Sequence, residues 1–119
     1  MNRRIALLGI FAISCFPEYG ASQTQDFTAK TMLGWCTSEN GSKSDIMCNI
    51  YMIGYVQALH IVDSQQKIQG LCLPDHFTPF EARAIFIREL RTVPALQDMA
   101  PDVAVWASLH HEFPCPNSN

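Results

Sequence analysis

The stretch SDIMCNIYMIGYVQALHIVDS, residues 44–64, decides the fold of this chain. It contains no proline and is long enough for about six helical turns at 1.5 Å per residue. Ser44 is placed to cap the first turn, and Asp45 puts a negative charge where the helix dipole favours one. At 100° per residue its polar side chains form one narrow stripe. That stripe consists of Asn49, Gln57, His60 and Ser64.

Nearly every other side chain of this stretch is apolar. These residues are Ile46, Cys48, Ile50, Tyr51, Met52, Tyr55, Val56, Ala58, Leu59, Ile61 and Val62. A helix so apolar on most of its circumference is expected to be covered on most sides, and its polar interruptions argue against a membrane span. Gly54 predicts a neighbouring helix close to the backbone, with a hinge as the alternative. Ile53 lies in the polar stripe, either as a lone exposed side chain or as a contact with another chain.

Residues 1–22 have the layout of a secretory signal peptide. Two arginines precede an uncharged run, residues 5–16, and small residues follow it. We predict cleavage near Ala21 or Ser22 and a periplasmic or secreted protein. A weak lipoprotein-like sequence leaves lipidation of Cys15 as an alternative.

Residues 23–119 are enough for a single domain. They carry six lysines and arginines against ten aspartates and glutamates, a net charge near −4. This mildly acidic balance argues against nucleic acid and anionic membranes as partners, and leaves basic partners open.

Four cysteines remain after signal removal: Cys36, Cys48, Cys72 and Cys115. An even number in a small exported chain indicates two disulfides, for which three pairings are compatible with the sequence. We favour Cys36–Cys48 and Cys72–Cys115, because the first pair lies at the two ends of a short loop between helices. On the chain-entropy argument, closing loops of about 13 and 44 residues contributes about 3 and 4 kcal/mol. Metal binding is the competing interpretation, but the chain has neither CxxC nor HxxxH.

Three further helices are predicted around the long one. A short helix covers residues 27–38, with Thr28 as its cap. Thr78, Pro79 and Glu81 form a capping box before a helix that runs to residue 92. A short turn at 95–99 precedes a last helix at 101–112. The apolar faces of the last two helices are predicted to contain Ala82, Ile85, Phe86 and Leu90, and Val103, Trp106, Ala107, Leu109 and Phe113. The predicted fold is an all-α, compact bundle of four main helices around a long central helix, with two disulfides.

No catalytic constellation emerges from the sequence, so we predict no enzyme, no catalytic or metal-binding residue and no cofactor. Oxidised cysteines exclude a thiolate nucleophile, and the chain lacks GxSxG, HExxH and a phosphate-binding glycine loop. His110 and His111 lie about 100° apart on a helix, which suits a solvated or helix-capping role rather than chelation. The four histidines keep a response to acid open as an alternative.

Four short motifs occur in order along residues 23–119. The first is Trp35-Cys36, and the second is C-x-x-Y-x-x-G-Y, from Cys48 to Tyr55. The third is CLP-x-x-x-T, from Cys72 to Thr78, and the fourth is Leu109 followed four residues later by Phe-Pro-Cys. With these spacings the chain resembles the Rap/Tai family of type VI secretion immunity proteins.

The resemblance implies an exported, disulfide-bonded, all-helical protein that often dimerises and neutralises a cell-wall amidase effector by occupying its active-site groove. It does not identify the residues that bind the effector. Exposed loops held by disulfides lose little entropy on binding, so we expect contacts from the loop at 39–43 and the segment at 65–77. The candidate partner-binding residues are Asn40, Ser42, Lys43, Ile53, His60, Asp75 and His76.

Two other hypotheses remain at this point. One is a periplasmic acid-stress chaperone similar to the small helical HdeA type, which exposes apolar surface when acidified. The other is a periplasmic helical binding protein without a toxin partner. Aggregation protection between pH 2 and 7 separates the chaperone from an inhibitor.

Overall fold

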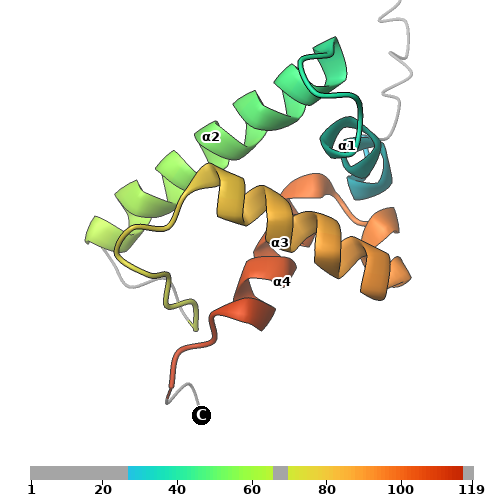
Figure 1. The fold of residues 1–119 in the computed structure, drawn as a ribbon. Coiled ribbons are helices and arrows are strands. Elements are labelled where there is room, and N and C mark those ends of the chain that lie inside the picture. Colours follow the sequence, from blue (N-terminus) through green and yellow to red (C-terminus); the bar gives the residue numbers. More distant parts are fainter. Residues whose placement is uncertain (1–26, 66–69, 117–119) are drawn as a thin grey trace, which may run out of the picture.

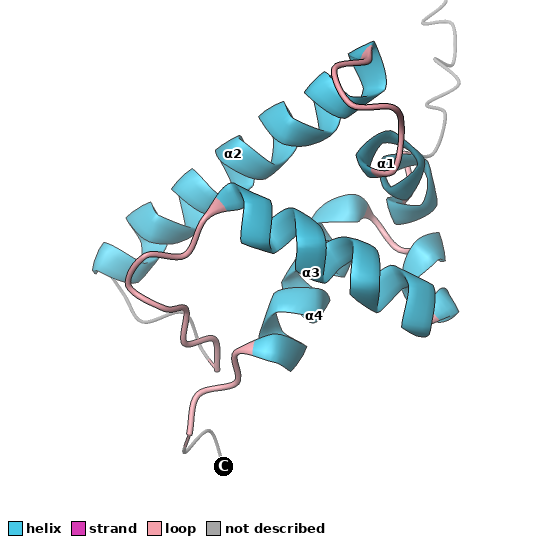
Figure 2. Ribbon diagram, in the orientation of Figure 1, coloured by secondary structure: helices cyan, strands magenta, loops and turns pink. Residues whose placement is uncertain are grey.

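The computed structural model describes residues 27–65 and 70–116, which form an all-helical domain (Figure 2). Its elements are α1 (Ala29–Cys36), α2 (Lys43–Gln65), α3 (Pro79–Thr92), the 3₁₀ helix η1 (Pro94–Asp98) and α4 (Pro101–Glu112). Within the described ranges, β pairing is confined to one isolated bridge between Leu71 and Pro114. The predicted four-helix, all-α fold is confirmed. The predicted signal peptide and Cys15 lie outside the described residues.

The helices pack around α3, which contacts α1, α2, α4 and η1. α2 is the longest helix and runs along one side of the bundle, with α1 beside its N-terminal end (Figure 1). α4 packs against α3. Residues 70–78, before α3, run close to the chain that follows α4 (Figure 1).

Local capping signals set two of the helix starts. At α3, the backbone N–H of Thr78 donates to Glu81 Oε2 at 2.7 Å, and the N–H of Glu81 donates to Thr78 Oγ1 at 3.3 Å, which confirms the predicted capping box. At α2, the predicted cap Ser44 is wrong. The N–H of Asp45 donates to Ser42 Oγ at 3.2 Å, and α2 begins at Lys43, so the cap lies two residues earlier than expected.

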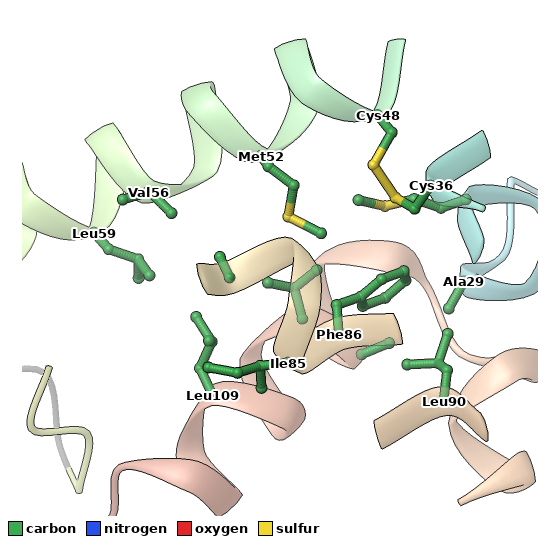
Figure 3. Packing of buried hydrophobic residues seen from close by; sticks show 14 of the residues in the cluster. Ala29, Cys36, Cys48, Met52, Val56, Leu59, Ile85, Phe86, Leu90 and Leu109 are labelled. Carbon is green, nitrogen blue, oxygen red and sulfur yellow. A yellow bond between two sulfur atoms is a disulfide. The ribbon is translucent and has the colours of Figure 1, made fainter. Parts of the chain in front are cut away.

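The core gathers side chains from all four α-helices (Figure 3). From α2, Met52, Val56 and Leu59 point toward α3, where Ile85 and Phe86 meet them (Figure 3). The predicted apolar face of α3 is confirmed, since all four of its residues are buried. On α4 the packed face is rotated from the predicted one, because the helix meets α3 through Ala104, Val105, Ser108 and Leu109. Val103, predicted on the apolar side, is therefore 48% exposed.

The expectation that α2 is covered on most sides is wrong. Its buried apolar residues are Cys48, Met52, Val56 and Leu59, whose spacing of four, four and three residues makes one face. Other apolar side chains of the helix are exposed: Ile46, Met47, Ile50, Ile53, Ile61 and Val62. Ile50, for example, is 59% exposed. The physical reason is the number of neighbours, because among the described elements only α1 and α3 pack extensively against α2.

Both favoured disulfides are present. Cys36–Cys48 joins the end of α1 to α2 (Figure 3), and Cys72–Cys115 joins the segment before α3 to the chain after α4. Two backbone hydrogen bonds flank the second disulfide, from Cys72 N–H to Phe113 O at 2.9 Å and from Cys115 N–H to Gly70 O at 3.0 Å. Gly70 has a φ of +79°, and a Cβ there would lie 2.8 Å from His110 Nε2. This position therefore requires glycine.

Candidate protein-binding surface

The outer face of α2 is an exposed apolar surface on the side of the helix away from the core. We define it as Ile46, Met47, Ile50, Ile53, Gly54 and Ala58, all of which are exposed. At 100° per residue these six positions cover less than half of the helix circumference. Exposed apolar side chains gathered on one helix face, here with the polar side chain of Gln57 among them, are typical of a surface that another protein covers.

Two of the six residues of this outer face, Gly54 and Ala58, are small and lie along one side of it. Nothing lies within 4 Å of a Cβ built on Gly54, so the prediction that a helix of this chain passes close to it is wrong. The open space is on the solvent side instead. Gly54 and Ala58 are one helical turn apart, with Ile50 and Ile53 beside them, so a partner element can approach the backbone of α2 closely.

Residues 43–62 are long and apolar enough to cross a membrane, yet core helices of folded domains meet the same criteria. Only 28% of that window is buried in the domain. The fold therefore accounts for a minor part of the apolar character of α2, and the outer face accounts for much of the rest.

An arginine from α3 fixes the N-terminal end of α2. Arg83 Nη2 lies 2.7 Å from Asp45 Oδ1, and Arg83 Nη1 donates to Asn49 Oδ1 at 2.7 Å. The same guanidinium donates to the carbonyl of Cys36 at 2.6 Å. One side chain thus ties the end of α1, the start of α2 and the middle of α3 together. Pairing satisfies the buried Asp45, which would otherwise be costly to desolvate.

The loop between α1 and α2 is held by the same cluster. Asp45 Oδ2 accepts a hydrogen bond from Gly41 N–H at 2.9 Å, and Gly41 has a φ of +79°. This backbone hydrogen bond, followed by the one from Arg83, lowers the pKa of Asp45 below its usual 3.8. Ser38 Oγ and Ser42 Oγ lie 3.1 Å apart across the loop. With Cys36–Cys48 at its base, the loop is pre-organised.

The predicted partner-binding residues fall into two groups at opposite ends of α2. Asn40, Ser42 and Lys43 lie at its N-terminal end, while His60, Asp75 and His76 lie toward its C-terminal end, with Ile53 between them. Lys43 and His60 are about 25 Å apart along the axis at 1.5 Å per residue. The structure therefore does not bring the candidates into one site.

Exposure differs among these candidates. Ser42 is half-buried and is used as the cap of α2, whereas Asn40 and Lys43 are exposed. His60 Nε2 is 3.3 Å from the carbonyl oxygen of Phe77, which places His60 beside the exposed turn at Asp75 and His76. Asn40, Lys43, Asp75 and His76 thus remain accessible at the two ends of the outer face.

A second charged cluster joins α3 to α4. Buried Glu89 has its Oε2 3.0 Å from His111 Nδ1 and its Oε1 3.3 Å from Arg88 Nη2. The sequence indicated a solvated or capping role for His111, and its contact with Glu89 was not foreseen. We interpret this cluster as structural, since it supplies partners for a buried carboxylate. In the described part of the chain, no group of three or more His, Cys, Asp or Glu side chains can hold a metal ion.

An open pocket of about 310 Å³ lies where α2 meets α4. It is lined by Tyr55, Asp102, Val103 and Trp106. The Tyr55 hydroxyl donates to the backbone oxygen of Asp102 at 3.1 Å. Burial, then the negative charges that Tyr51 and Asp102 carry when ionised, raises the pKa of Tyr55 to about 12. The sequence did not predict this pocket, because its residues come from two helices, and Tyr55 and Asp102 are 47 positions apart in the chain.

Comparison with known families matches residues 28–115 to the family described as Rap1a immunity proteins. The chain belongs to the Rap1a immunity protein family. The match spans nearly all of the described residues and confirms the predicted resemblance. Neither a curated protein nor a solved structure matches the chain. Membership of the Rap1a family makes this an immunity-type protein, whose partner is a cognate effector.

Proposed function

We propose that this protein is an exported inhibitor that binds and blocks a type VI secretion cell-wall amidase effector. The observation that carries the proposal is the Rap1a family match over residues 28–115. The exposed outer face of α2 supports it, because an inhibitor needs apolar surface that its own fold does not use. In this role the protein acts on its partner and catalyses nothing itself.

Inhibition by a rigid helical domain is steric. The domain obstructs the active-site groove of the amidase, and the affinity comes from a few well-packed anchor residues surrounded by a polar rim. Ile50 and Ile53 are suited to be anchors, because they are exposed, apolar and adjacent to the low surface at Gly54. Asn40, Lys43, Asp75 and His76 are suited to the rim. The clamped loop before α2 reduces the entropy lost when the complex forms.

Export and self-association belong to the same proposal. A cell-wall amidase acts outside the cytoplasm, so its inhibitor is expected in the periplasm after cleavage near Ala21 or Ser22. Two disulfides fit an oxidising compartment. A homodimer is the second association that the family resemblance implies, and the outer face of α2 offers apolar surface for it.

The central test measures peptidoglycan cleavage by a purified amidase encoded next to this chain, with and without the protein. Loss of amidase activity at an equimolar ratio is expected. Full cleavage in the presence of excess inhibitor would reject the proposal. Protection of unfolded proteins from aggregation at pH 2 without inhibition would instead favour the acid-stress chaperone.

A matched pair of variants tests whether the outer face makes the contact. Ile50→Asp places a charge in the middle of that face, while Phe80→Asp changes another exposed apolar residue, at the start of α3. Inhibition is expected to weaken at least about tenfold for the first and to stay unchanged for the second. Light scattering on each protein alone shows whether Ile50→Asp acts on effector binding or on a homodimer.

A further inference from the structure

The pocket between α2 and α4 combines an aromatic and apolar lining with an acidic residue. Tyr55 and Trp106 supply aromatic rings, and Val103 adds an exposed apolar side chain. Asp102, in the first turn of α4, supplies a carboxylate. At about 310 Å³ the pocket is at the lower limit for small-molecule sites, which suits one extended side chain.

Among the residues that the structure describes, none forms a hydrogen bond or ion pair with the Asp102 carboxylate. Ion pairs in the described part of the chain join Arg83 to Asp45, Arg88 to two glutamates, and His111 to Glu89, and Asp102 is in none of them. Tyr55 bonds to the backbone oxygen of Asp102 rather than to its carboxylate. The carboxylate charge nevertheless acts on the pocket, since it contributes to the raised pKa values of Tyr51 and Tyr55.

We propose that the pocket of Tyr55, Asp102, Val103 and Trp106 binds an arginine or lysine side chain of the effector, an inference that rests on the proposed function. A cation placed against aromatic rings gains from their quadrupoles, and it gains a charge-assisted hydrogen bond from a carboxylate at the rim. Arginine fits both features, since its planar guanidinium stacks on rings while its N–H groups bind carboxylate. An apolar group would leave Asp102 desolvated without a partner, and an anion would be repelled.

The position and charge of the pocket fit a basic protein partner. Tyr55 lies about 60° around the helix from Ala58, so a partner that covers the outer face of α2 reaches the pocket at the edge of that face. The domain as a whole is acidic, with six basic against ten acidic side chains in residues 23–119. Opposite charge across an interface favours encounter and fixes the register of the complex.

A small probe tests the pocket without any effector. The disulfide-bonded protein is titrated with N-acetyl-arginine amide, and the indole N–H of Trp106 is followed by NMR, with that of Trp35 as reference. The neutral isostere N-acetyl-citrulline amide is the matched ligand control. We expect the arginine probe to shift the Trp106 signal with a dissociation constant of about millimolar order, and the citrulline probe to bind at least about fivefold more weakly.

Three variants test whether the Asp102 carboxylate causes the preference for the arginine probe over the citrulline probe. Asp102→Asn is expected to abolish the preference for arginine over citrulline, Asp102→Glu to retain it, and Asp98→Asn, an exposed carboxylate on η1, to leave it unchanged. Equal binding of the two probes, or an arginine preference that survives Asp102→Asn, would overturn the pocket assignment.

The amidase assay then separates this inference from the proposed function. Asp102→Asn is expected to inhibit the amidase about tenfold more weakly than the unchanged protein. Undiminished inhibition by this variant would reject the pocket as an effector contact while leaving the inhibitor function in place. Failure of the unchanged protein to inhibit would reject the proposed function, whatever the probe shows.

Discussion

The two faces of α2 differ in use although both are apolar. The inner face, with Met52 and Val56, is buried against α1 and α3, while the outer face, with Ile50 and Ile53, is exposed. The apolar composition of α2 favours its packing in the domain, but the arrangement of the neighbouring helices decides which of its faces is buried. The difference teaches that an apolar residue on this helix serves either folding or association, and that the two uses can be separated by mutation.

The largest expected difference in the free energy of unfolding is between one residue of the inner face and one residue of the outer face. Met52→Ala is expected to lower the free energy of unfolding by about 2–5 kcal/mol, because it removes a fully buried side chain and leaves a cavity. Ile50→Ala is expected to change it by less than about 0.5 kcal/mol, because that side chain is already exposed. Urea unfolding with the disulfides intact measures both. Equal destabilisation by the two variants would show that the outer face is covered within the folded chain.

A substitution at Gly54 separates the contribution of the outer face to stability from its contribution to partner binding. Gly54→Ala is expected to raise the free energy of unfolding by about 1 kcal/mol, because alanine favours the helix and its Cβ meets open space. Amidase inhibition by the same variant is expected to weaken if a partner approaches the backbone there. Gly34→Ala in α1, also with open space around it, is the control that gains stability without losing inhibition.

Gly70→Ala is expected to lower the free energy of unfolding, since the φ of Gly70 is +79° and His110 occupies the space that a Cβ would need.

Acidification tests the clamp at the N-terminal end of α2, which is the set of contacts that Asp45 makes with Gly41 and Arg83. The pKa of Asp45 is lowered in the folded chain by its hydrogen bonds to Gly41 and Arg83. The resulting stability is therefore fully present above the ordinary pKa near 3.8 and is lost as the pH falls through the lower, folded-state pKa. Glu81, whose pKa is lowered by Thr78, acts in the same direction.

Asp45→Asn isolates this contribution. Urea midpoints of the variant and the unchanged protein are expected to differ at pH 7 and to converge as the pH falls below about 4. A constant difference from pH 7 to pH 2 would mean that the Asp45 charge is not what the clamp depends on. Removing the clamp should leave the inner face of α2 packed, so the far-ultraviolet circular dichroism at pH 7 should not change.

Much of the fold was predictable because its signals are local. Prolines at the starts of α3 and α4 and the capping box at Thr78 indicate helix bounds without knowledge of neighbours, and the cysteine spacing favoured the observed pairing among three that the sequence allows. The covered face of α2 was not predictable, because both of its faces are apolar and only tertiary packing distinguishes them. The contact of Arg83 with Asp45 and the pocket at Asp102 join distant parts of the chain and leave no local pattern.

The smallest expected effect lies at the edge between the two faces, where Tyr55 meets α4. Its pKa is about 12, raised first by burial and then by neighbouring negative charge that includes Asp102. Asp102→Asn removes that charge and should lower the pKa of Tyr55, which should stay above 10 because burial is unchanged. The absorbance of the phenolate at alkaline pH measures the change, and Asp98→Asn should leave it unaltered. An unshifted titration in Asp102→Asn would place the carboxylate away from the phenol, and the outer face would then have no charged pocket at its edge.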